Sequence, residues 1–250
     1  MSRLVLITGA CGGIGRVLCA RFAANGDRVL ALDHDRAALD ALVAGQGGCV
    51  AIHADLLDAT GMAVALAGHD VDVVVANAGA ADAMTLRTTT AASWQRDIDL
   101  NLNGTFNTVE AVRAGMQARG KGNLVLVGSV NGLAAIGHPA YSAAKAGLIS
   151  YTKALALEFG PYGIRANIIC PGTVKTQAWQ ARVDKDPQVL ERLKKWYPLG
   201  DFATPDDIAD AALFLASGAA RVITGVVLPV DGGLMAGNRM LAQDLTLESF

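Results

Sequence analysis

Apolar segments of strand length alternate with longer segments of helical periodicity along the chain. The segments expected to form strands are Arg3–Thr8, Arg28–Asp33, Cys49–Asp55, Val71–Gly79, Asn123–Ser129, Arg165–Gly172 and Gly225–Gly233. Several are apolar at consecutive positions, which is typical of parallel strands covered by helices on both faces. The segments expected to form helices are Ile14–Ala24, Arg36–Ala44, Trp94–Arg119, Pro139–Phe159 and Pro205–Ala216. This alternation predicts an α/β protein with a single-domain, doubly wound (Rossmann-type) parallel sheet of about seven strands.

One connection departs from this alternation. The segment Thr173–Leu199 is long for a link between a strand and a helix, and it contains Trp179, Trp196 and Tyr197 beside a charged stretch. Long connections often form lids or binding loops, so we expect a substrate lid at about residues 173–200. A pair of ordinary surface helices is the alternative. We expect a dinucleotide-binding part at about residues 1–130 and a catalytic and substrate part at about 129–250.

Composition and charge narrow the class of protein. Hydrophobic residues make up 52% of the 250 residues and charged residues 18%, which favours an extensively buried core. The net charge of −2 gives no indication of binding to nucleic acid or to an anionic membrane. No apolar segment approaches the roughly 18 residues needed to cross a bilayer. The four cysteines have no paired metal-binding spacing, so we expect reduced thiols, no metal and a cytoplasmic location.

A glycine-rich turn, "TGACGGIG", follows the first predicted strand. Gly9 permits a tight turn, Gly13 allows the backbone to approach a pyrophosphate, and Gly15 allows the helix to pack closely against the strand. The start of the helix offers free N–H groups and a positive dipole end to phosphate. Because a strand and a helix flank the turn, it predicts a nucleotide-binding site.

Asp33 ends the second predicted strand, where a carboxylate can accept hydrogen bonds from an adenosine ribose. Its charge would repel a 2′-phosphate, and Gly12 offers no basic side chain to one. NAD is therefore expected rather than NADP, although Arg36 is near enough to complicate this preference. In the alternative interpretation, Asp33 only caps the following helix.

Tyr141 and Lys145, in "HPAYSAAKAGL", lie one turn apart on one face of a predicted helix. A free phenol has a pKa of about 10, and a nearby ammonium is expected to lower it, as is a cationic nicotinamide ring. Tyr141 could then remove the hydroxyl proton of an alcohol while hydride leaves for NAD. Ser129, at the end of the fifth predicted strand, could hydrogen-bond the same substrate oxygen.

In sequence order, these motifs resemble those of the short-chain dehydrogenase/reductase family in its form of about 250 residues. The matching segments are "TGACGGIG", Asp33, "ADL" with Asp55, "ANAG" at 76–79, "DLNLNGTF" with Asn101, "VGSVNG" with Ser129, "YSAAK", "PGTVKT" and "DGG" at 231–233. Ala76 stands where the family's N-N-A-G motif has its first asparagine, a departure from which we expect little effect on the chemistry.

The resemblance implies a catalytic tetrad of Asn101, Ser129, Tyr141 and Lys145. Tyr141 would be the acid/base, and Ser129 would polarise and hold the reacting oxygen. Lys145 would lower the pKa of the phenol and bind the nicotinamide ribose, and Asn101 would position a water that relays protons to Lys145. The implied cofactor-binding residues are Gly9, Cys11, Gly12, Gly13, Ile14, Gly15, Asp33, Asp55, Leu56, Asn77, Ala78, Gly79, Tyr141, Lys145, Pro171, Gly172, Val174 and Thr176. The resemblance also implies a homotetramer.

The substrate is less well determined by the sequence. The candidates for substrate contact are Ser129, Asn131, His138, Tyr141, Gln177 and Trp179. Their polar or amphipathic character favours a small alcohol or ketone, such as a sugar or polyol, over a steroid or long acyl chain. Three functions stay open: an NAD-dependent dehydrogenase of a secondary alcohol, a reductase of 3-oxoacyl thioesters, and an NAD-binding sensor or scaffold without turnover. The tail after Gly233 is expected to cross a surface between subunits.

Overall fold

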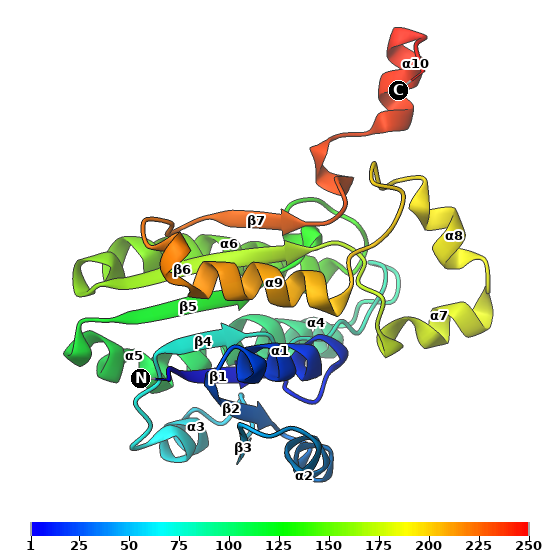
Figure 1. Ribbon diagram of the computed structural model, residues 1–250. Coiled ribbons are helices and arrows are strands. Elements are labelled where there is room, and N and C mark those ends of the chain that lie inside the picture. Colours follow the sequence, from blue (N-terminus) through cyan, green and yellow to red (C-terminus); the bar gives the residue numbers. More distant parts are fainter. Residues whose placement is uncertain (1, 250) are drawn as a thin grey trace.

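Seven parallel strands form one sheet in the computed structural model, which describes residues 2–249 (Figure 1). Their order is β3-β2-β1-β4-β5-β6-β7, so the direction of winding reverses between β1 and β4. The bounds are β1 (Leu4–Thr8), β2 (Arg28–Asp33), β3 (Cys49–His53), β4 (Val73–Ala76), β5 (Gly122–Val127), β6 (Ile164–Pro171) and β7 (Val227–Val230). The predicted doubly wound sheet is confirmed, and its topology places a ligand crevice beyond the carboxyl ends of the strands.

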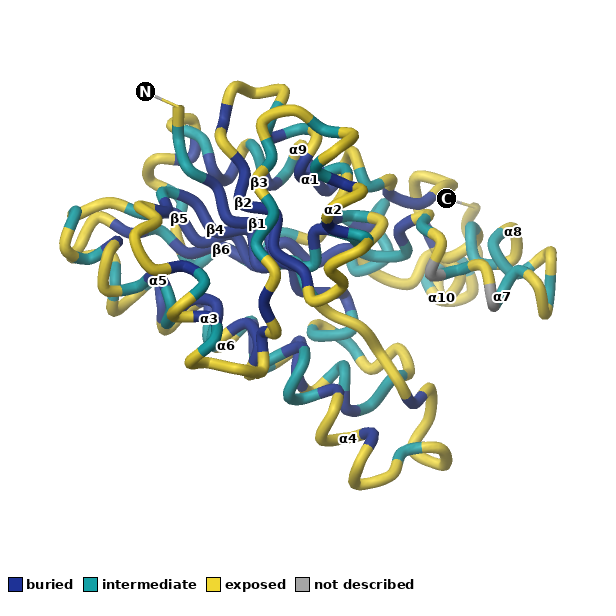
Figure 2. The backbone as a smooth tube through the Cα atoms, turned by 90° about the horizontal axis from the view of Figure 1, so that it is seen from below, coloured by how far each residue is buried: buried dark blue, intermediate teal, exposed yellow. Residues whose placement is uncertain are grey.

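Helices cover both faces of the sheet because successive strand residues point to opposite sides and both sides are apolar. In β1, Val5 and Ile7 pack with α1, α2 and α9, whereas Leu6 belongs to a second cluster with α3, α5 and α6. The helix bounds are α1 (Gly13–Ala24), α2 (Arg36–Gly45), α3 (Ala59–Leu66), α4 (Ala91–Ile98), α5 (Gly104–Arg119), α6 (Pro139–Phe159) and α9 (Pro205–Ala216). Figure 2 shows the central strands as the most deeply buried part of the chain.

The predicted helix Trp94–Arg119 differs from the structure in two respects. It begins earlier, at Ala91, because the Thr90 hydroxyl accepts a hydrogen bond from the Ser93 N–H and caps the helix. It is also interrupted between α4 and α5 by a π-helical turn at Asp99–Asn103. Apolar periodicity does not distinguish such a wide turn from the α-helix around it, and π-turns are frequent at functional sites.

Strand β4 is shorter than the predicted segment Val71–Gly79. Beyond its end, the N–H groups of Asn77 and Ala78 donate to the Thr8 hydroxyl at 3.1 and 3.2 Å. The Asn77 side chain also donates to the carbonyls of Thr8 and Gly9. These polar contacts draw the chain out of the sheet and place the residues after β4 beside the glycine-rich turn.

The connection after β6 carries two short helices, α7 (Gln180–Lys185) and α8 (Val189–Lys194), which lie beyond the carboxyl ends of the strands (Figure 1). After β7 the chain extends away from the sheet and ends with α10 (Arg239–Thr246) (Figure 1). Within residues 2–249, no helix is both long enough and apolar enough to cross a membrane.

Candidate active site

Two adjoining cavities lie at the carboxyl ends of the strands. The first, of 590 Å³, is bordered by the glycine-rich turn, the end of β2 and the segment after β4. The second, of 860 Å³, is bordered by the segment after β5, the start of α6 and the connection after β6. Ile14, Asn77, Gly79 and Ala80 line both cavities, so the two form one continuous site.

The glycine-rich turn needs its glycines for two different reasons. Gly9 has a positive φ of 63°, and a Cβ there would lie 2.8 Å from the Cα of Ala78. A Cβ on Gly13 would lie 2.9 Å from the Thr176 side chain, across the first cavity. Gly15 lines neither cavity, and a Cβ there would overlap the Gly9 carbonyl. Gly9 and Gly15 thus allow the turn to form, whereas Gly13 leaves the groove open.

The Asp33 carboxylate lies at the rim of the first cavity and is only 8% exposed. It accepts hydrogen bonds from the backbone N–H groups of Cys11 at 2.9 Å and His34 at 2.8 Å. The N-cap of α2 is Asp35, whose side chain accepts from the Ala38 N–H, so the alternative role of Asp33 as the helix cap is wrong. With a third hydrogen bond from the Asp35 N–H at 3.2 Å, three backbone donors hold the Asp33 carboxylate at the rim of the cavity.

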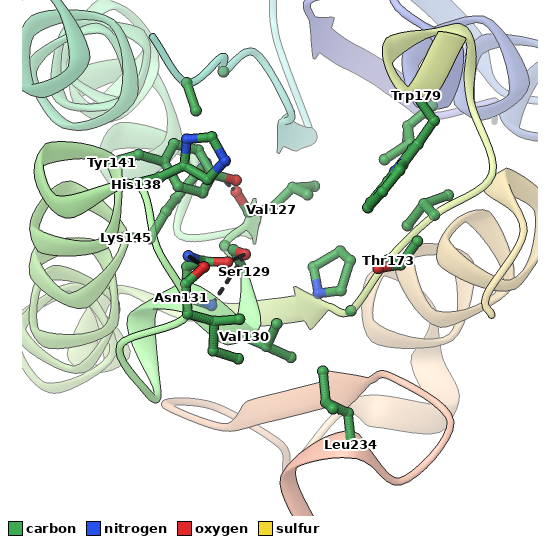
Figure 3. Close-up of a pocket in the computed structure, with 18 of the residues that line it drawn as sticks. Val127, Ser129, Val130, Asn131, His138, Tyr141, Lys145, Thr173, Trp179 and Leu234 are labelled. Carbon is green, nitrogen blue, oxygen red and sulfur yellow. Dashed lines mark hydrogen bonds between the residues drawn. The ribbon is translucent and has the colours of Figure 1, made fainter. Parts of the chain in front are cut away.

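The second cavity brings Ser129, Tyr141 and Lys145 together (Figure 3). The Ser129 hydroxyl accepts a hydrogen bond from the Asn131 N–H at 3.1 Å. The Lys145 Nζ donates to the Val127 carbonyl at 2.9 Å and lies 5.4 Å from the centre of the Tyr141 ring. The spacing along α6 therefore places the ammonium against the phenol, as the sequence predicted.

Burial dominates the titration of both groups. It lowers the pKa of Lys145 to about 8 and raises the pKa of Tyr141, while the Ser129 hydroxyl lowers the pKa of Tyr141. In the protein alone the net pKa of Tyr141 is therefore raised, opposite to the lowered value expected from the ammonium. For Tyr141, removal from water disfavours the phenolate more strongly than the Ser129 hydrogen bond favours it. For Lys145, removal from water disfavours the ammonium more strongly than Cys170 favours it.

Asn101 is fully buried behind Lys145, in the π-helical turn. Its Nδ2 donates to the carbonyls of Ala80 at 2.7 Å and Asp97 at 2.8 Å. Its Oδ1 has no hydrogen-bond partner among the described residues. A Cβ on Gly79 would lie 2.6 Å from this oxygen and 3.2 Å from the Lys145 Nζ, so the glycine keeps a polar gap open between them.

Most of the predicted site residues line the two cavities. The first cavity is lined by Gly9, Cys11, Gly12, Gly13, Ile14, Asp33, Asp55, Leu56, Asn77, Ala78, Gly79 and Thr176. The second is lined by Ser129, Asn131, His138, Tyr141, Lys145, Pro171, Gly172, Val174 and Trp179. Gly15, Asn101 and Gln177 line neither. Gln177 is exposed, because the short turn at Gln177–Trp179 directs the tryptophan rather than the glutamine into the cavity.

Arg182 also lines the second cavity and was not among the predicted site residues. Its Nη2 lies 3.2 Å from the His138 Nε2, and its guanidinium carbon lies 4.8 Å from the centre of the Trp179 ring. Arg182 lies within a charged stretch and resembles an ordinary surface residue there. Its spacing of three from Trp179 was the available signal, since residues three apart share a helix face.

An all-parallel sheet of this order, with a glycine-rich turn and an acidic residue at its crevice, defines a Rossmann-type α/β protein. A family model described as enoyl-(acyl carrier protein) reductase matches residues 9–235. The chain belongs to the short-chain dehydrogenase/reductase family, as its similarity to known oxidoreductases also shows.

The chain is similar along most of its length to the following three proteins. An uncharacterised oxidoreductase of Schizosaccharomyces pombe is 45% identical, over 99% of this chain and 96% of that protein. A galactitol 2-dehydrogenase (L-tagatose-forming) of Cereibacter sphaeroides is 37% identical, over 91% and 92%. The crystal structure of a short-chain dehydrogenase/reductase family oxidoreductase from Burkholderia thailandensis is 65% identical, with a TM-score of 0.98 over 100% of this chain and 99% of that one.

Proposed function

We propose that the protein is an NAD-dependent dehydrogenase that oxidises a secondary alcohol of a small hydroxylated substrate. The observation that carries this proposal is the convergence of Ser129, Tyr141 and Lys145 on a cavity continuous with the dinucleotide crevice. The relatives named galactitol 2-dehydrogenase and D-threitol dehydrogenase support a polyol or a similar ligand.

The first cavity fits a nicotinamide dinucleotide. Its glycine groove would accept the pyrophosphate at the start of α1, and Asp33 would accept hydrogen bonds from the adenosine ribose. Asp55 and Leu56 would border the adenine, and Val174 and Thr176 the carboxamide. When bound, the cofactor accepts the hydride from the carbinol carbon, and its positively charged ring favours the Tyr141 phenolate.

The preference for NAD rests on the charge at the end of β2. A 2′-phosphate would meet the buried Asp33 carboxylate, and the Arg36 Nη2 is directed to His53 Nδ1 at 3.2 Å. Similar solved structures carry either cofactor: a 3-oxoacyl-[acyl-carrier protein] reductase from Brucella melitensis has bound NAD, and a putative gluconate 5-dehydrogenase from Beutenbergia cavernae has bound NADP. The preference for NAD is therefore proposed from Asp33 and Arg36 of this chain and not from the cofactors of similar structures.

In the proposed mechanism, Tyr141 takes the substrate hydroxyl proton and Ser129 donates a hydrogen bond to the same oxygen. Lys145, held by the Val127 carbonyl, binds the nicotinamide ribose and stabilises the phenolate. The unpartnered Oδ1 of Asn101 faces the gap beside Lys145, which suits a water that passes protons to the ammonium. Together these roles would convert the alcohol to a ketone as hydride leaves for the cofactor.

The reduction of 3-oxoacyl thioesters is the second candidate, favoured by the similarity to the Brucella melitensis reductase, which is 34% identical with a TM-score of 0.85. Such a reductase would present unpaired basic residues at the mouth of the site to an acidic carrier. In the lid, Arg192 pairs with Asp186 and Lys194 with Glu191. These two ion pairs neutralise the cations within α8, so this helix offers little free positive charge to an acidic carrier.

Absorbance at 340 nm separates these functions. The protein is mixed with NAD or NADP and a panel of polyols, sugars and hydroxyacyl thioesters, and we expect NADH formation with members of the first two groups. Preferential turnover of acyl thioesters with NADP(H) would support the reductase. Tight NAD binding without turnover of any substrate would support an NAD sensor.

We also propose a homotetramer in the cytoplasm. Phe106 on α5 and Leu157 on α6 are 48% and 79% exposed, which suits helix pairing between subunits. The extended tail carries exposed Met240, Leu241 and Leu245 on α10, which suits contact with a neighbouring subunit. The four cysteines are free thiols, as a reducing compartment requires. Light scattering of the full chain and of a variant truncated before Asn238 tests the assembly.

A further inference from the structure

The second cavity contains a cation that the proposed proton transfer does not use. Lys145 and Arg182 both line it, and none of its lining residues is an aspartate or glutamate. Lys145 is bound to the Val127 carbonyl deep in the site, whereas Arg182 enters from the lid. Among the described residues, Arg182 forms no ion pair with a carboxylate. The cavity is therefore positively charged at the end formed by the lid.

His138 holds the guanidinium in place. The Nδ1 of His138 lies 3.2 Å from the Ala83 carbonyl, which only accepts hydrogen bonds, so Nδ1 carries the proton. In the neutral ring Nε2 is then an acceptor, and it takes a hydrogen bond from the Arg182 Nη2 at 3.2 Å. Trp179 flanks the guanidinium from the lid. One donor of Arg182 is thus used, and most of its five remain for a ligand.

The backbone of His138 supports a binding role for this arrangement. His138 has a φ of 49°, a conformation that a residue with a Cβ rarely adopts, and its N–H donates to the Met84 carbonyl. It precedes α6 by one residue, and its ring lies edge-on to the Tyr141 ring with 6.3 Å between their centres. Arg182 contacts His138, and the His138 ring lies against Tyr141. The guanidinium and the phenol are therefore close enough for one small molecule to contact both.

We propose that the substrate is a hydroxy acid whose carboxylate is bound by Arg182 while its hydroxyl group contacts Tyr141 and Ser129. The planar guanidinium matches a carboxylate with two parallel hydrogen bonds, which no hydroxyl of a neutral polyol reproduces. The half-buried guanidinium lies beside the Trp179 ring in a cavity that Trp196 and Leu193 also line, and these side chains offer it no counter-charge, so an anionic ligand group would stabilise it most. This inference rests on the proposed dehydrogenase function and narrows its substrate class.

The chemical step leaves the carboxylate unchanged. The carbinol C–H bond breaks and its electron pair passes to NAD as hydride, while the O–H proton passes to Tyr141. The carbon is oxidised to a ketone, NAD is reduced to NADH, and the product is an oxo acid. Arg182 is thus a specificity-determining residue, and its effect belongs to substrate binding rather than to proton transfer.

Matched substrates test the charge requirement. We expect C4–C6 aldonates and simple 2- and 3-hydroxy acids to be oxidised with a kcat/KM about 10- to 100-fold above that of the alditols of equal length and of the methyl esters of the same acids. In Arg182→Gln, the KM for the acids should rise by a similar factor with little change in kcat, and Arg182→Lys should restore part of the loss. Lys185→Gln, a change at an exposed lid cation outside the cavity, is the control and should behave as the parent.

Two kinetic outcomes would overturn the proposal, and a binding measurement can contradict it independently. One is equal or better turnover of the alditols and esters by the parent protein, and the other is an equal loss for charged and neutral substrates in Arg182→Gln, which indicates a purely structural role in the lid. Calorimetric binding of hydroxy acids to the protein–NAD complex needs no turnover, and equal binding by the parent and Arg182→Gln would also contradict the anion site. Full turnover by Tyr141→Phe would instead contradict the proposed function and leave the Arg182 result unaffected.

Discussion

The ammonium of Lys145 lies 5.4 Å from the centre of the Tyr141 ring, and both side chains project from one face of α6 into the same cavity. The hydrogen bond from Nζ to the Val127 carbonyl anchors the lysine to the end of β5. A helix and the sheet therefore fix the separation of the two groups jointly. In the protein alone, burial disfavours the charged form of each group.

Replacement of Tyr141 by phenylalanine tests its role as the proton acceptor. We expect a fall in kcat of roughly 10²- to 10⁴-fold, the usual contribution of a positioned acid/base, with NAD binding retained. Tyr151→Phe, on the same helix, is the matched control. Within the part of the chain that the structure describes, its buried hydroxyl has no hydrogen-bond partner, so its loss should leave activity unchanged and stability equal or slightly higher. Steady-state kinetics and NAD titration provide the measurements, and a fully active Tyr141→Phe would exclude the mechanism.

Lys145 should make stability depend on pH in the alkaline range. Burial lowers its pKa from 10.5 to about 8, so between these pH values the unfolded chain binds more protons than the folded protein. The contribution of Lys145 to the free energy of unfolding should therefore rise as the pH increases from about 8 toward 10.5, by at most roughly 3 kcal/mol. Urea unfolding of the parent and of Lys145→Met at several pH values in this range measures the difference. A pH-independent difference would show that the lysine is not desolvated.

Asp33 should determine the choice between NAD and NADP. In Asp33→Ser we expect the KM for NAD to rise by about tenfold and the preference for NAD over NADP to shrink, because the ribose acceptor and the repelling charge are both lost. Asp35→Asn is the control, since it removes a nearby charge while its oxygen still caps α2 through the Ala38 N–H. Kinetics with both cofactors distinguish the two variants. The same shift in both would mean that charge near the cleft, rather than the Asp33 position, sets the preference.

Gly79→Ala should reduce activity by closing the gap between Asn101 and Lys145. The new Cβ would lie 2.6 Å from the Asn101 Oδ1 and 3.2 Å from the Lys145 Nζ, so buried groups must move. We expect a lower kcat and a destabilisation of about 1–3 kcal/mol. Gly45→Ala is the control, because no atom lies within 4 Å of its added Cβ, and it should be neutral or slightly stabilising. Parent-like kinetics in Gly79→Ala would contradict a role for the gap.

Sequence pattern was sufficient to predict the sheet and most of the residues that line the first cavity. The apolar strands, the glycine-rich turn and the acidic residue that ends β2 each depend on neighbours close in the chain, and parallel topology brings strand ends to one edge. The four-residue spacing of Tyr141 and Lys145 was equally informative, because α6 is a regular helix in that region. Local periodicity and motif spacing together thus determine the fold and the position of the phenol beside the ammonium.

Other features depend on packing between segments far apart in the chain. The contact of Arg182 with His138 spans 44 positions, and the π-helical turn buries the Oδ1 of Asn101 with no hydrogen-bond partner in residues 2–249 as described. The raised pKa of Tyr141 follows from the removal of water by several elements at once, which pairwise spacing does not reveal. Tertiary structure alone determines that Arg182 brings a positive charge to the second cavity and that burial raises the pKa of Tyr141. Both effects depend on desolvation and on contacts between distant segments, which arise only when separate elements meet.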